Sequence, residues 1–295
     1  MGLRDLLKRI LGSGDSGLCV AELARRLGLE EETVRSVEVS YSRFAIPKRS
    51  GGTRIIQSPN RELKRLQRRI HHRLLKRIRA HPAVRGFERR QSIVTNALPH
   101  QNKAIVLRMD VKDFFQSTQS DRVREMFLRL GWNREAATLL TKLCTHDGGL
   151  PQGAPTSPRL SSLVNLRLDM RLASAAKKGS AEYTRYADDL TFSFEDDDSL
   201  AARKMIRVTK LVLQDFGYKL HTRKKLLIRR QHQQQLVTGL VVNHRAHLPR
   251  RTRRWLRAVE HHAATGRPSS LSSAQLEGWR SFHSMVSRQA GVAGS

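Results

Sequence analysis

The feature that most constrains the fold is a pair of acids between two runs of strand-forming residues. Asp188 and Asp189 stand between Arg-Tyr-Ala and Leu-Thr-Phe-Ser-Phe, so Tyr183–Phe194 is predicted to form a β-hairpin with both acids at its turn. Asp is common in turns, so an ordinary acidic turn is one interpretation. The alternative is a cation site, because adjacent carboxylates repel each other unless a cation lies between them. Mg²⁺ prefers such oxygens together with substrate phosphates.

A second acid ends an apolar run. Ala104–Val111 is predicted to be a strand, and Asp110 lies at its end. Two metals about 3.5–4 Å apart that catalyse phosphoryl transfer share ligands, and one carboxylate from each of two neighbouring strands would supply them. The spacing along the chain leaves open whether Asp110 and Asp188 meet in space, and we expect that they do.

The chain is strongly basic, which makes these acids stand out. It has 55 Lys and Arg against 26 Asp and Glu, a formal net charge of +29. Such an excess favours a polyanion partner, above all nucleic acid, because guanidinium groups bind phosphates with two hydrogen bonds. A membrane partner is not expected, because no apolar run is long enough to span a bilayer and no basic amphipathic helix carries a large apolar face. Met1–Asp15 lacks the apolar centre of a signal peptide, so we expect a cytoplasmic protein. Cys19 and Cys144 stand far apart without a CxxC motif, which argues against a disulfide framework or a cysteine zinc site.

Hydrophobic spacing predicts helices mixed with hairpins. Leu18–Val37 is predicted to form two short helices with a break at Gly28, either a helix-turn-helix or an ordinary packed pair. Ile46–Pro59 is predicted to form a hairpin around Gly51–Gly52. The other expected elements are a helix with apolar positions from Leu63 to Ile78, helices Arg122–Leu130, Arg134–Cys144, Ser157–Ala176 and Leu200–Phe216, a loop at His146–Thr156, β-like runs Tyr218–His221, Lys225–Arg229 and Leu236–Val242, a solvated acidic loop at Glu195–Asp198, and a helical tail from His244.

Two basic regions are candidates for nucleic-acid contact. The helix that includes Arg65, Arg68 and Arg69 carries like charges that repel one another, and a polyanion would relieve that repulsion. A solvated helix face is the other interpretation. The tail segment Arg245–Arg257 has six arginines and no acid.

In their order along Tyr41–Asn243, these motifs resemble a reverse transcriptase of the bacterial retron type. MDVKDFF, LPQGAPTSPRLSSLVN and YADD resemble its first three palm motifs, FGYKLHTRKK its lysine-bearing fourth, and IPKRSGGTRIIQSP its fingers segment. Asn96–His100 resembles the NAxxH element and Val237–Gly239 the VTG element that mark retron enzymes. A group II intron-like or other bacterial reverse transcriptase is the alternative, which these two elements argue against. A non-catalytic RNA-binding module or a DNA-binding regulator would not explain the paired acids.

The resemblance implies an α+β right-hand polymerase with three parts. N-terminal helices and fingers would occupy residues 1–105, a palm of antiparallel sheet and helices residues 106–235, and a small basic helical thumb residues 236–295. The implied activity is RNA-directed DNA polymerase, a nucleotidyltransferase that uses dNTPs. It would copy part of a cognate structured non-coding RNA into single-stranded DNA. Priming from an RNA 2′-hydroxyl would give a branched RNA–DNA product, and an effector protein in anti-phage defence is an implied partner.

The resemblance also assigns candidate site residues. Two Mg²⁺ ions would be held by Asp110, Asp188, Asp189 and the backbone of Val111, and Lys224, with Lys225 as a rival, would be the general acid. Phe115 matches the position that excludes a ribose 2′-hydroxyl. The candidate nucleotide-binding residues are Lys48, Arg49, Arg54, Asp113, Phe115, Gln152 and Gly153. The candidate RNA-binding residues are Arg65, Arg68, Arg69, Asn96, His100, Thr238, Arg250, Arg251, Arg253, Arg254 and Trp255. For Asn96, His100 and the VTG element a role in bracing the palm is the alternative, and for Trp255 it is core packing.

Overall fold

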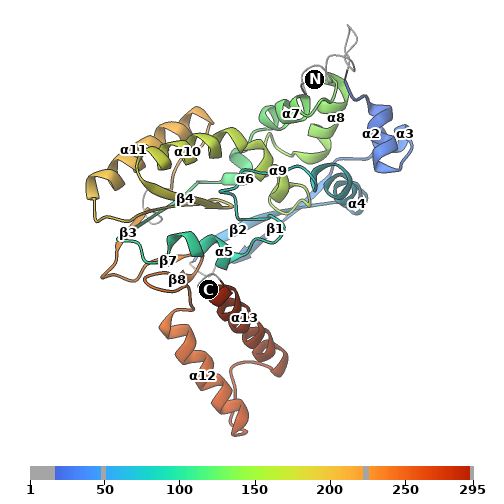
Figure 1. The fold of residues 1–295 in the computed structure, drawn as a ribbon. Coiled ribbons are helices and arrows are strands. Elements are labelled where there is room, and N and C mark those ends of the chain that lie inside the picture. Colours follow the sequence, from blue (N-terminus) through green and yellow to red (C-terminus); the bar gives the residue numbers. More distant parts are fainter. Residues whose placement is uncertain (1–16, 48–50, 222–225, 293–295) are drawn as a thin grey trace. The chain divides into compact units, whose positions relative to one another are not determined.

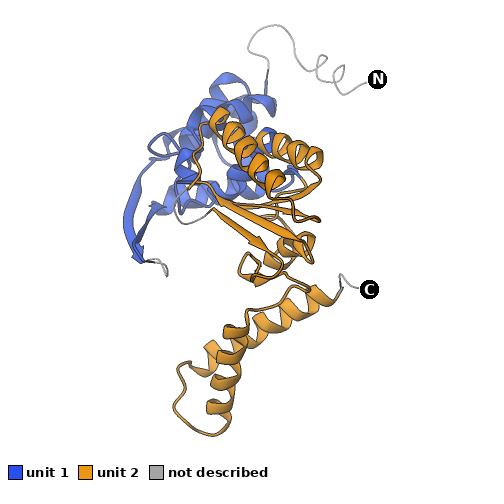
Figure 2. Ribbon diagram, turned by 90° about the vertical axis from the view of Figure 1, so that its left-hand side faces the viewer, with its two compact units in different colours: residues 1–81, 112–167 blue, residues 82–111, 168–295 orange. Residues whose placement is uncertain are grey.

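A computed structural model describes residues 17–47, 51–221 and 226–292 of the chain. The chain divides into two compact units, shown in Figure 2. Unit 1 comprises residues 1–81 and 112–167, and unit 2 comprises residues 82–111 and 168–295. The boundaries of these two units differ from those of the predicted fingers, palm and thumb. The division into fingers, palm and thumb is functional, and it stays a prediction.

Unit 1 is built mainly from helices. The predicted N-terminal pair is confirmed as α2 (Val20–Leu27) and α3 (Glu31–Ser36), with Gly28 at the end of α2. Apolar residues of both helices share one buried core with other helices of the unit. These are α4 (Arg61–Ile70), the π-helix η1 (His71–Leu75), α7 (Ser120–Arg129), α8 (Arg134–Cys144) and α9 (Ser157–Val164).

The first predicted hairpin is also confirmed, and it extends from the helices of unit 1 (Figure 2). Strands β1 (Tyr41–Pro47) and β2 (Thr53–Pro59) pair antiparallel, with Tyr41 opposite Pro59 and Pro47 opposite Thr53. The backbone N–H of Gln57 donates to the carbonyl of Gln152 at 2.8 Å. The loop after α8 is therefore attached to the base of the hairpin.

Unit 2 is built on a four-stranded antiparallel sheet of order β4-β5-β3-β6. Its strands are β3 (Ile105–Asp110), β4 (Ala181–Tyr186), β5 (Asp189–Phe194) and β6 (Leu227–Arg230). Helices α10 (Leu166–Lys178) and α11 (Ser199–Asp215) lie across one face (Figure 1). The other face carries α5 (Ile93–Ala97), the 3-10 helix η2 (Leu98–His100) and the small hairpin of β7 (Leu236–Val237) and β8 (Leu240–Val241). Helices with antiparallel strands confirm the predicted α+β class.

The two faces of this sheet differ in chemistry, because side chains alternate along each strand. Leu107, Leu190 and Phe192 are fully buried on the face toward α10 and α11. On the opposite face the register places Asp110 opposite Asp189 and Arg108 opposite Thr191. The acids therefore stand on the more polar of the two faces of the sheet.

The prediction of one long helix over Ser157–Ala176 is wrong. The structure has two helices, α9 and α10, which are separated at Asn165. The buried Asn165 amide donates to the Ser161 carbonyl at 2.9 Å and accepts from Arg122 at 2.7 Å. The apolar spacing continues across the break, so the hydrophobic pattern could not reveal it.

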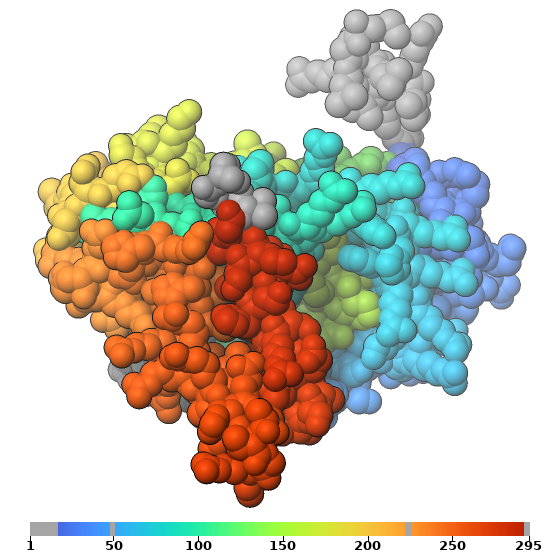
Figure 3. Space-filling view, turned by 60° about the horizontal axis from the view of Figure 1, so that its bottom comes forward, coloured from blue at the N-terminus to red at the C-terminus, as the bar shows by residue number. Residues whose placement is uncertain are grey.

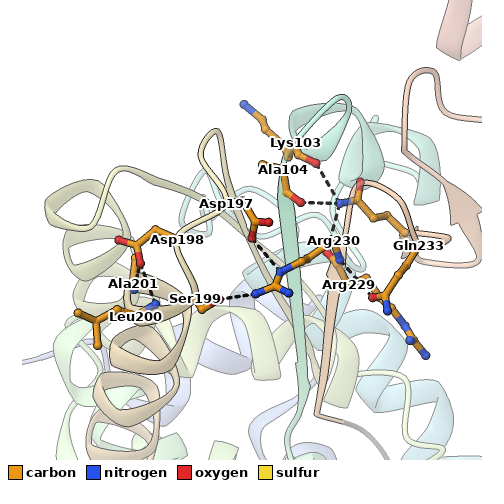
Figure 4. A network of polar contacts seen from close by, with 11 residues as sticks. Lys103, Ala104, Asp197, Asp198, Ser199, Leu200, Ala201, Arg229, Arg230 and Gln233 are labelled. Atoms are coloured by element: carbon orange, nitrogen blue, oxygen red, sulfur yellow. Dashed lines mark hydrogen bonds and ion pairs between the residues drawn. The ribbon is translucent and has the colours of Figure 1, made fainter.

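Two further expectations change in detail. The run Tyr218–His221 makes only a single bridge, between Leu220 and Val111, rather than a strand. The acids after β5 are more than a solvated loop (Figure 4). Asp198 accepts from the N–H groups of Leu200 and Ala201 at the start of α11, and Asp197 pairs with Arg230 of β6 at 2.8 Å.

The C-terminal helices of unit 2 are α12 (Arg250–Ala264) and α13 (Ser273–Val292), which lie side by side (Figure 3). Leu256, Val259 and Leu276 form the small core between them. The far part of α13 belongs to a different cluster, because Val286 packs with Val94 of α5. Among the described residues, no helix is long and apolar enough to cross a membrane.

Candidate active site

Three acids meet at one end of the unit 2 sheet. Asp110 ends β3 and lies opposite Asp189, which begins β5. The backbone N–H of Val111 donates to the carbonyl of Asp188 at 3.0 Å. Asp110 is only 7 % exposed, and Asp188 and Asp189 are half-buried. The structure therefore places Asp110 beside the turn that carries Asp188, which the spacing along the chain had left open.

The turn that carries Asp188 has an unusual backbone. Ala187 adopts φ +56°, in the left-handed region that alanine seldom occupies. The segment that precedes α5 lies directly against this turn, because a Cβ atom added to Gly86 would stand 2.6 Å from the nitrogen of Ala187. A larger residue than glycine at position 86 would push the turn out of place.

The donors at this end of the sheet suit a hard divalent cation. Asp110 and Asp188 offer carboxylate oxygens, and the backbone of Val111 stands beside them. The carboxylate of Asp189 accepts from Nη2 of Arg108 at 3.2 Å. Among the described residues, no group of three or more His, Cys, Asp or Glu side chains is arranged to hold a metal ion. A cation that keeps several waters and takes substrate phosphates as ligands needs only one or two protein carboxylates, so the donors fit such a cation.

Two candidate nucleotide-binding residues of unit 1, Gln152 and Gly153, lie against β2 near the base of the hairpin, whereas Arg54 lies near its tip. Gly153 has φ +134°, and a Cβ there would lie 2.7 Å from the carbonyl of Gln57. Gln152 is tied to β2 by the hydrogen bond to Gln57, and Arg54 is exposed on the same strand. The predicted Lys48, Arg49, Lys224 and Lys225 lie outside the described residues.

Phe115 is half-buried in α6 (Phe114–Ser117), which follows Asp113. Its carbonyl accepts from the N–H of Leu150 at 3.1 Å, so α6 is joined to the loop that contains Gln152 and Gly153. Its ring packs partly against the core of unit 1. Asp113 is exposed and has φ +47°. The structure therefore brings Phe115, Gln152 and Gly153 together within one unit.

The arginines of α4 are exposed, but one of them has a structural task. Nη1 of Arg69 donates to the carbonyls of Leu27 and Gly28 at 3.3 and 3.1 Å, at the C-terminal end of α2. A cation there satisfies carbonyls that have no partner within the helix. Arg65 and Arg68 are exposed and stay candidates for RNA contact.

The NAxxH element is buried in unit 2. Asn96 and His100 are each 0 % exposed. Nδ1 of His100 lies 2.7 Å from Oγ of Ser193 on β5, and Nε2 lies 2.8 Å from Oγ1 of Thr184 on β4. His100 thus joins the two strands that carry the acidic turn. Neither side chain has surface to offer to RNA, which favours the bracing alternative for both.

The VTG element forms the turn between β7 and β8. Thr238 and Gly239 have φ +46° and +84°, as the tightest hairpin turns require. Oγ1 of Thr238 donates to the carbonyl of Ile93 at 2.8 Å, at the start of α5. Just before the turn, the buried amide of Gln235 donates to the carbonyls of Lys103, Ala104 and Arg229. The VTG and NAxxH elements therefore belong to one packed region.

The arginines at the start of α12 form an open basic surface. Arg250, Arg251, Arg253 and Arg254 are all exposed, and three of them line a shallow hollow. Trp255 is half-buried, and its ring packs edge-on against that of Trp279, with 5.2 Å between the ring centroids. The structure therefore favours core packing for Trp255.

Two buried residues of this site were absent from the sequence predictions. Arg185 of β4 and Asp169 of α10 form an ion pair beneath the acidic turn. The arginine directly before the Tyr-Ala-Asp-Asp motif was the available signal. Nothing in the local pattern distinguishes a buried arginine from the many exposed ones.

Comparisons with known proteins agree with the motifs. Residues 46–242 match the family model described as reverse transcriptase (RNA-dependent DNA polymerase). The Retron Mx65 reverse transcriptase of Myxococcus xanthus is 36% identical over 96% of this chain and 73% of its own length. The Retron Mx162 reverse transcriptase of the same organism is 35% identical over 97% of this chain and 68% of its own. The Retron Ec86 reverse transcriptase of Escherichia coli is 33% identical over 88% of this chain and 82% of its own.

The burial of His100 predicts a loss of stability in mild acid. Burial lowers the pKa of His100 from 6.5 to about 3. The unfolded chain therefore takes up a proton at this residue below pH 6.5, and the folded chain does not. The contribution of neutral His100 to the stability of the folded chain is complete above pH 6.5. It is lost as the pH falls toward 3, by about 1.4 kcal/mol per pH unit.

The measurement is urea unfolding from about pH 7.5 down to about pH 5. His100→Gln is the control, because it keeps hydrogen bonding to both hydroxyls but does not titrate. The native chain should lose stability more steeply than the variant, by a difference that approaches about 1.4 kcal/mol per pH unit. Equal slopes for the two chains would contradict the assignment.

Proposed function

The chain belongs to the retron reverse transcriptases and is an RNA-directed DNA polymerase that uses an RNA template and makes DNA; we propose that it does so with two Mg²⁺ ions held by Asp110 and Asp188. The observation that carries the proposal is the register of the sheet. It sets Asp110 opposite Asp189, while Val111 is hydrogen-bonded to the carbonyl of Asp188. Two neighbouring strands thereby supply carboxylates at one point, as a two-metal centre requires.

Each residue then has a defined task. When bound, the two ions would activate the attacking hydroxyl and stabilise the leaving pyrophosphate. Asp110, Asp188 and the carbonyl of Val111 would hold them. Asp189, paired with Arg108, would add its carboxylate charge beside the two ions. In unit 1, Arg54 would bind the triphosphate through charge-assisted hydrogen bonds, and the loop at Gln152 and Gly153 would shape the nucleotide pocket. Lys224 would donate the proton to pyrophosphate.

The finer functional picture rests on the family. We propose a right-hand arrangement of fingers, palm and thumb, with α12 and α13 as the thumb. The template would be part of a cognate structured RNA, priming would start from a 2′-hydroxyl of that RNA, and the product would be a branched RNA–DNA molecule. A defence effector as partner and a cytoplasmic location are further proposals of the same kind.

The metal site is tested by removing its charge. Asp188→Asn together with Asp189→Asn should lower DNA synthesis by at least about three orders of magnitude, because several kcal/mol of transition-state stabilisation are lost. RNA binding should survive, since the arginine surfaces are unchanged. Primer extension and filter binding measure the two effects.

Asp196→Asn with Asp197→Asn is the matched control, because it makes the same change of charge just beyond β5. This control should keep wild-type synthesis. Full synthesis by the Asp188 and Asp189 double variant, with Mg²⁺ present, would reject the metal assignment.

Phe115→Ala should admit ribonucleotides into the product. The smaller side chain leaves room for the 2′-hydroxyl, so the ratio of rNTP to dNTP incorporation should rise by on the order of tenfold or more. Incorporation of each nucleotide opposite one template base measures that ratio. If stability falls but the ratio does not change, Phe115 serves only to pack against the core of unit 1.

The basic start of α12 is the proposed contact for cognate RNA. Replacement of Arg250, Arg251, Arg253 and Arg254 by Gln should weaken binding of that RNA and its RNA-primed synthesis. The slope of log affinity against log salt should decrease by up to about 3–4, because each phosphate that an arginine neutralises adds about one unit to it. Extension of a pre-annealed primer on an unrelated template should suffer less.

The matched control removes four exposed cations of α11 instead, Arg203, Lys204, Arg207 and Lys210, again to Gln. It lowers the net charge equally and leaves α12 intact. If both fourfold variants lose cognate RNA to the same extent, α12 contributes only general charge and the selectivity lies elsewhere.

A further inference from the structure

A buried ion pair lies beneath the acidic turn, on the face of the sheet opposite the candidate metal site. Arg185 of β4 and Asp169 of α10 have side chains only 1% and 0% exposed. Nε of Arg185 donates to Oδ1 of Asp169 at 2.7 Å, and Nη2 donates to Oδ2 at 2.6 Å. The hydroxyl of Tyr183 donates to the same carboxylate at 2.9 Å. The guanidinium is therefore fixed on two of its nitrogens.

The remaining nitrogen of this guanidinium holds the turn itself. Nη1 of Arg185 donates to the carbonyl of Ala187 at 3.1 Å. Ala187 is the left-handed residue directly before Asp188, so its carbonyl sets the peptide plane from which Asp188 begins. The backbone of Arg185 is also fixed, since its N–H donates to Ala83 and its carbonyl accepts from Arg85, at 2.9 and 2.8 Å. A strained turn persists only where its surroundings determine it in this way.

We propose that Arg185 is a positioning residue for catalysis: anchored by Asp169, it holds the carbonyl of Ala187 and so fixes the direction of the Asp188 carboxylate. The inference rests on the proposed role of Asp188 in metal binding. Arginine suits this position because the donors of its rigid plane are spread over three nitrogens, which here reach Asp169 and Ala187 together, whereas the donors of a lysine ammonium share one nitrogen.

A purely structural role for the pair is the competing explanation, and the chemistry allows the two to be separated. Replacing a buried ion pair by apolar residues of similar volume is often neutral for stability, whereas removing one partner alone leaves a buried charge. The informative variant is therefore Arg185→Met with Asp169→Leu and Tyr183→Phe. It removes Arg185, Asp169 and the hydroxyl of Tyr183 together, so neither charge of the ion pair is left without the other.

Three measurements on the full chain follow. Urea unfolding should show retained stability. The single-turnover rate of nucleotide addition to a pre-annealed primer should fall on the order of 10- to 100-fold, the reduction that a displacement of about 1 Å produces. Binding of Mn²⁺, followed by the electron paramagnetic resonance of the free ion with a dideoxy-terminated primer–template and the next dNTP, should weaken severalfold. Affinity for the primer–template should not change.

Two further variants make the result decisive. Tyr183→Phe removes a hydrogen bond from the same carboxylate but leaves Arg185 on Ala187, so its rate and Mn²⁺ binding should match the native chain. Arg185→Lys keeps a cation beside Asp169, and its rate and Mn²⁺ binding should fall as in the apolar variant. A wild-type rate with wild-type Mn²⁺ binding in either the folded apolar variant or the lysine variant would overturn the proposal.

The same Mn²⁺ assay distinguishes the two levels of the argument. If Asp188→Asn with Asp189→Asn loses Mn²⁺ but the apolar variant does not, the metal site stands and the positioning role of Arg185 fails. If the Asp188 and Asp189 variant also retains Mn²⁺ binding, the proposed metal site fails.

Discussion

The antiparallel pairing of β3 with β5 is the constraint on which the candidate site depends. The pairing runs from Ile105 opposite Phe194 to Asp110 opposite Asp189. Because side chains alternate along a strand, a shift of one residue would turn the acids to the opposite face and bring Met109 and Leu190 to the polar one. The apolar residues that pack against α10 and α11 therefore specify the register, and the register brings the acids together.

The hairpin that carries the acids is supported from both faces by different chemistry. On the polar face, the neutral imidazole of His100 joins Thr184 to Ser193. On the apolar face, the buried guanidinium of Arg185 meets the carboxylate of Asp169. Both arrangements are costly if incomplete, because a buried polar group without a partner is strongly unfavourable. A hairpin with a left-handed alanine at its turn is thus given one preferred geometry.

Local patterns allowed much of this to be predicted, and the failures share one cause. Alternation around Asp188 and Asp189 predicted the hairpin, and the apolar run before Asp110 predicted β3, because each signal lies within one strand. The break at Asn165 escaped prediction, since it depends on a hydrogen bond from Arg122, 43 residues away. Arg185 escaped for the same reason: its burial makes sense only beside Asp169, which is 16 residues earlier on another element. Partners that only the fold brings together leave no periodic trace.

The elements that mark the family connect parts of unit 2, with Asn96 and His100 buried and the VTG turn partly exposed. The hydroxyl of Thr238 in the VTG turn donates a hydrogen bond to the carbonyl of Ile93. The hydroxyl of Ser92, which caps α5, donates to Oε1 of Gln289 on α13 at 2.6 Å. Through His100, the same α5 region is joined to the strands beside the acids. The segment from Ser92 to His100 therefore contacts both the C-terminal helix and the hairpin that carries the acids. The arginines at the start of α12 are exposed, so they, rather than the buried side chains of Asn96 and His100, form the surface that we propose for contact with RNA.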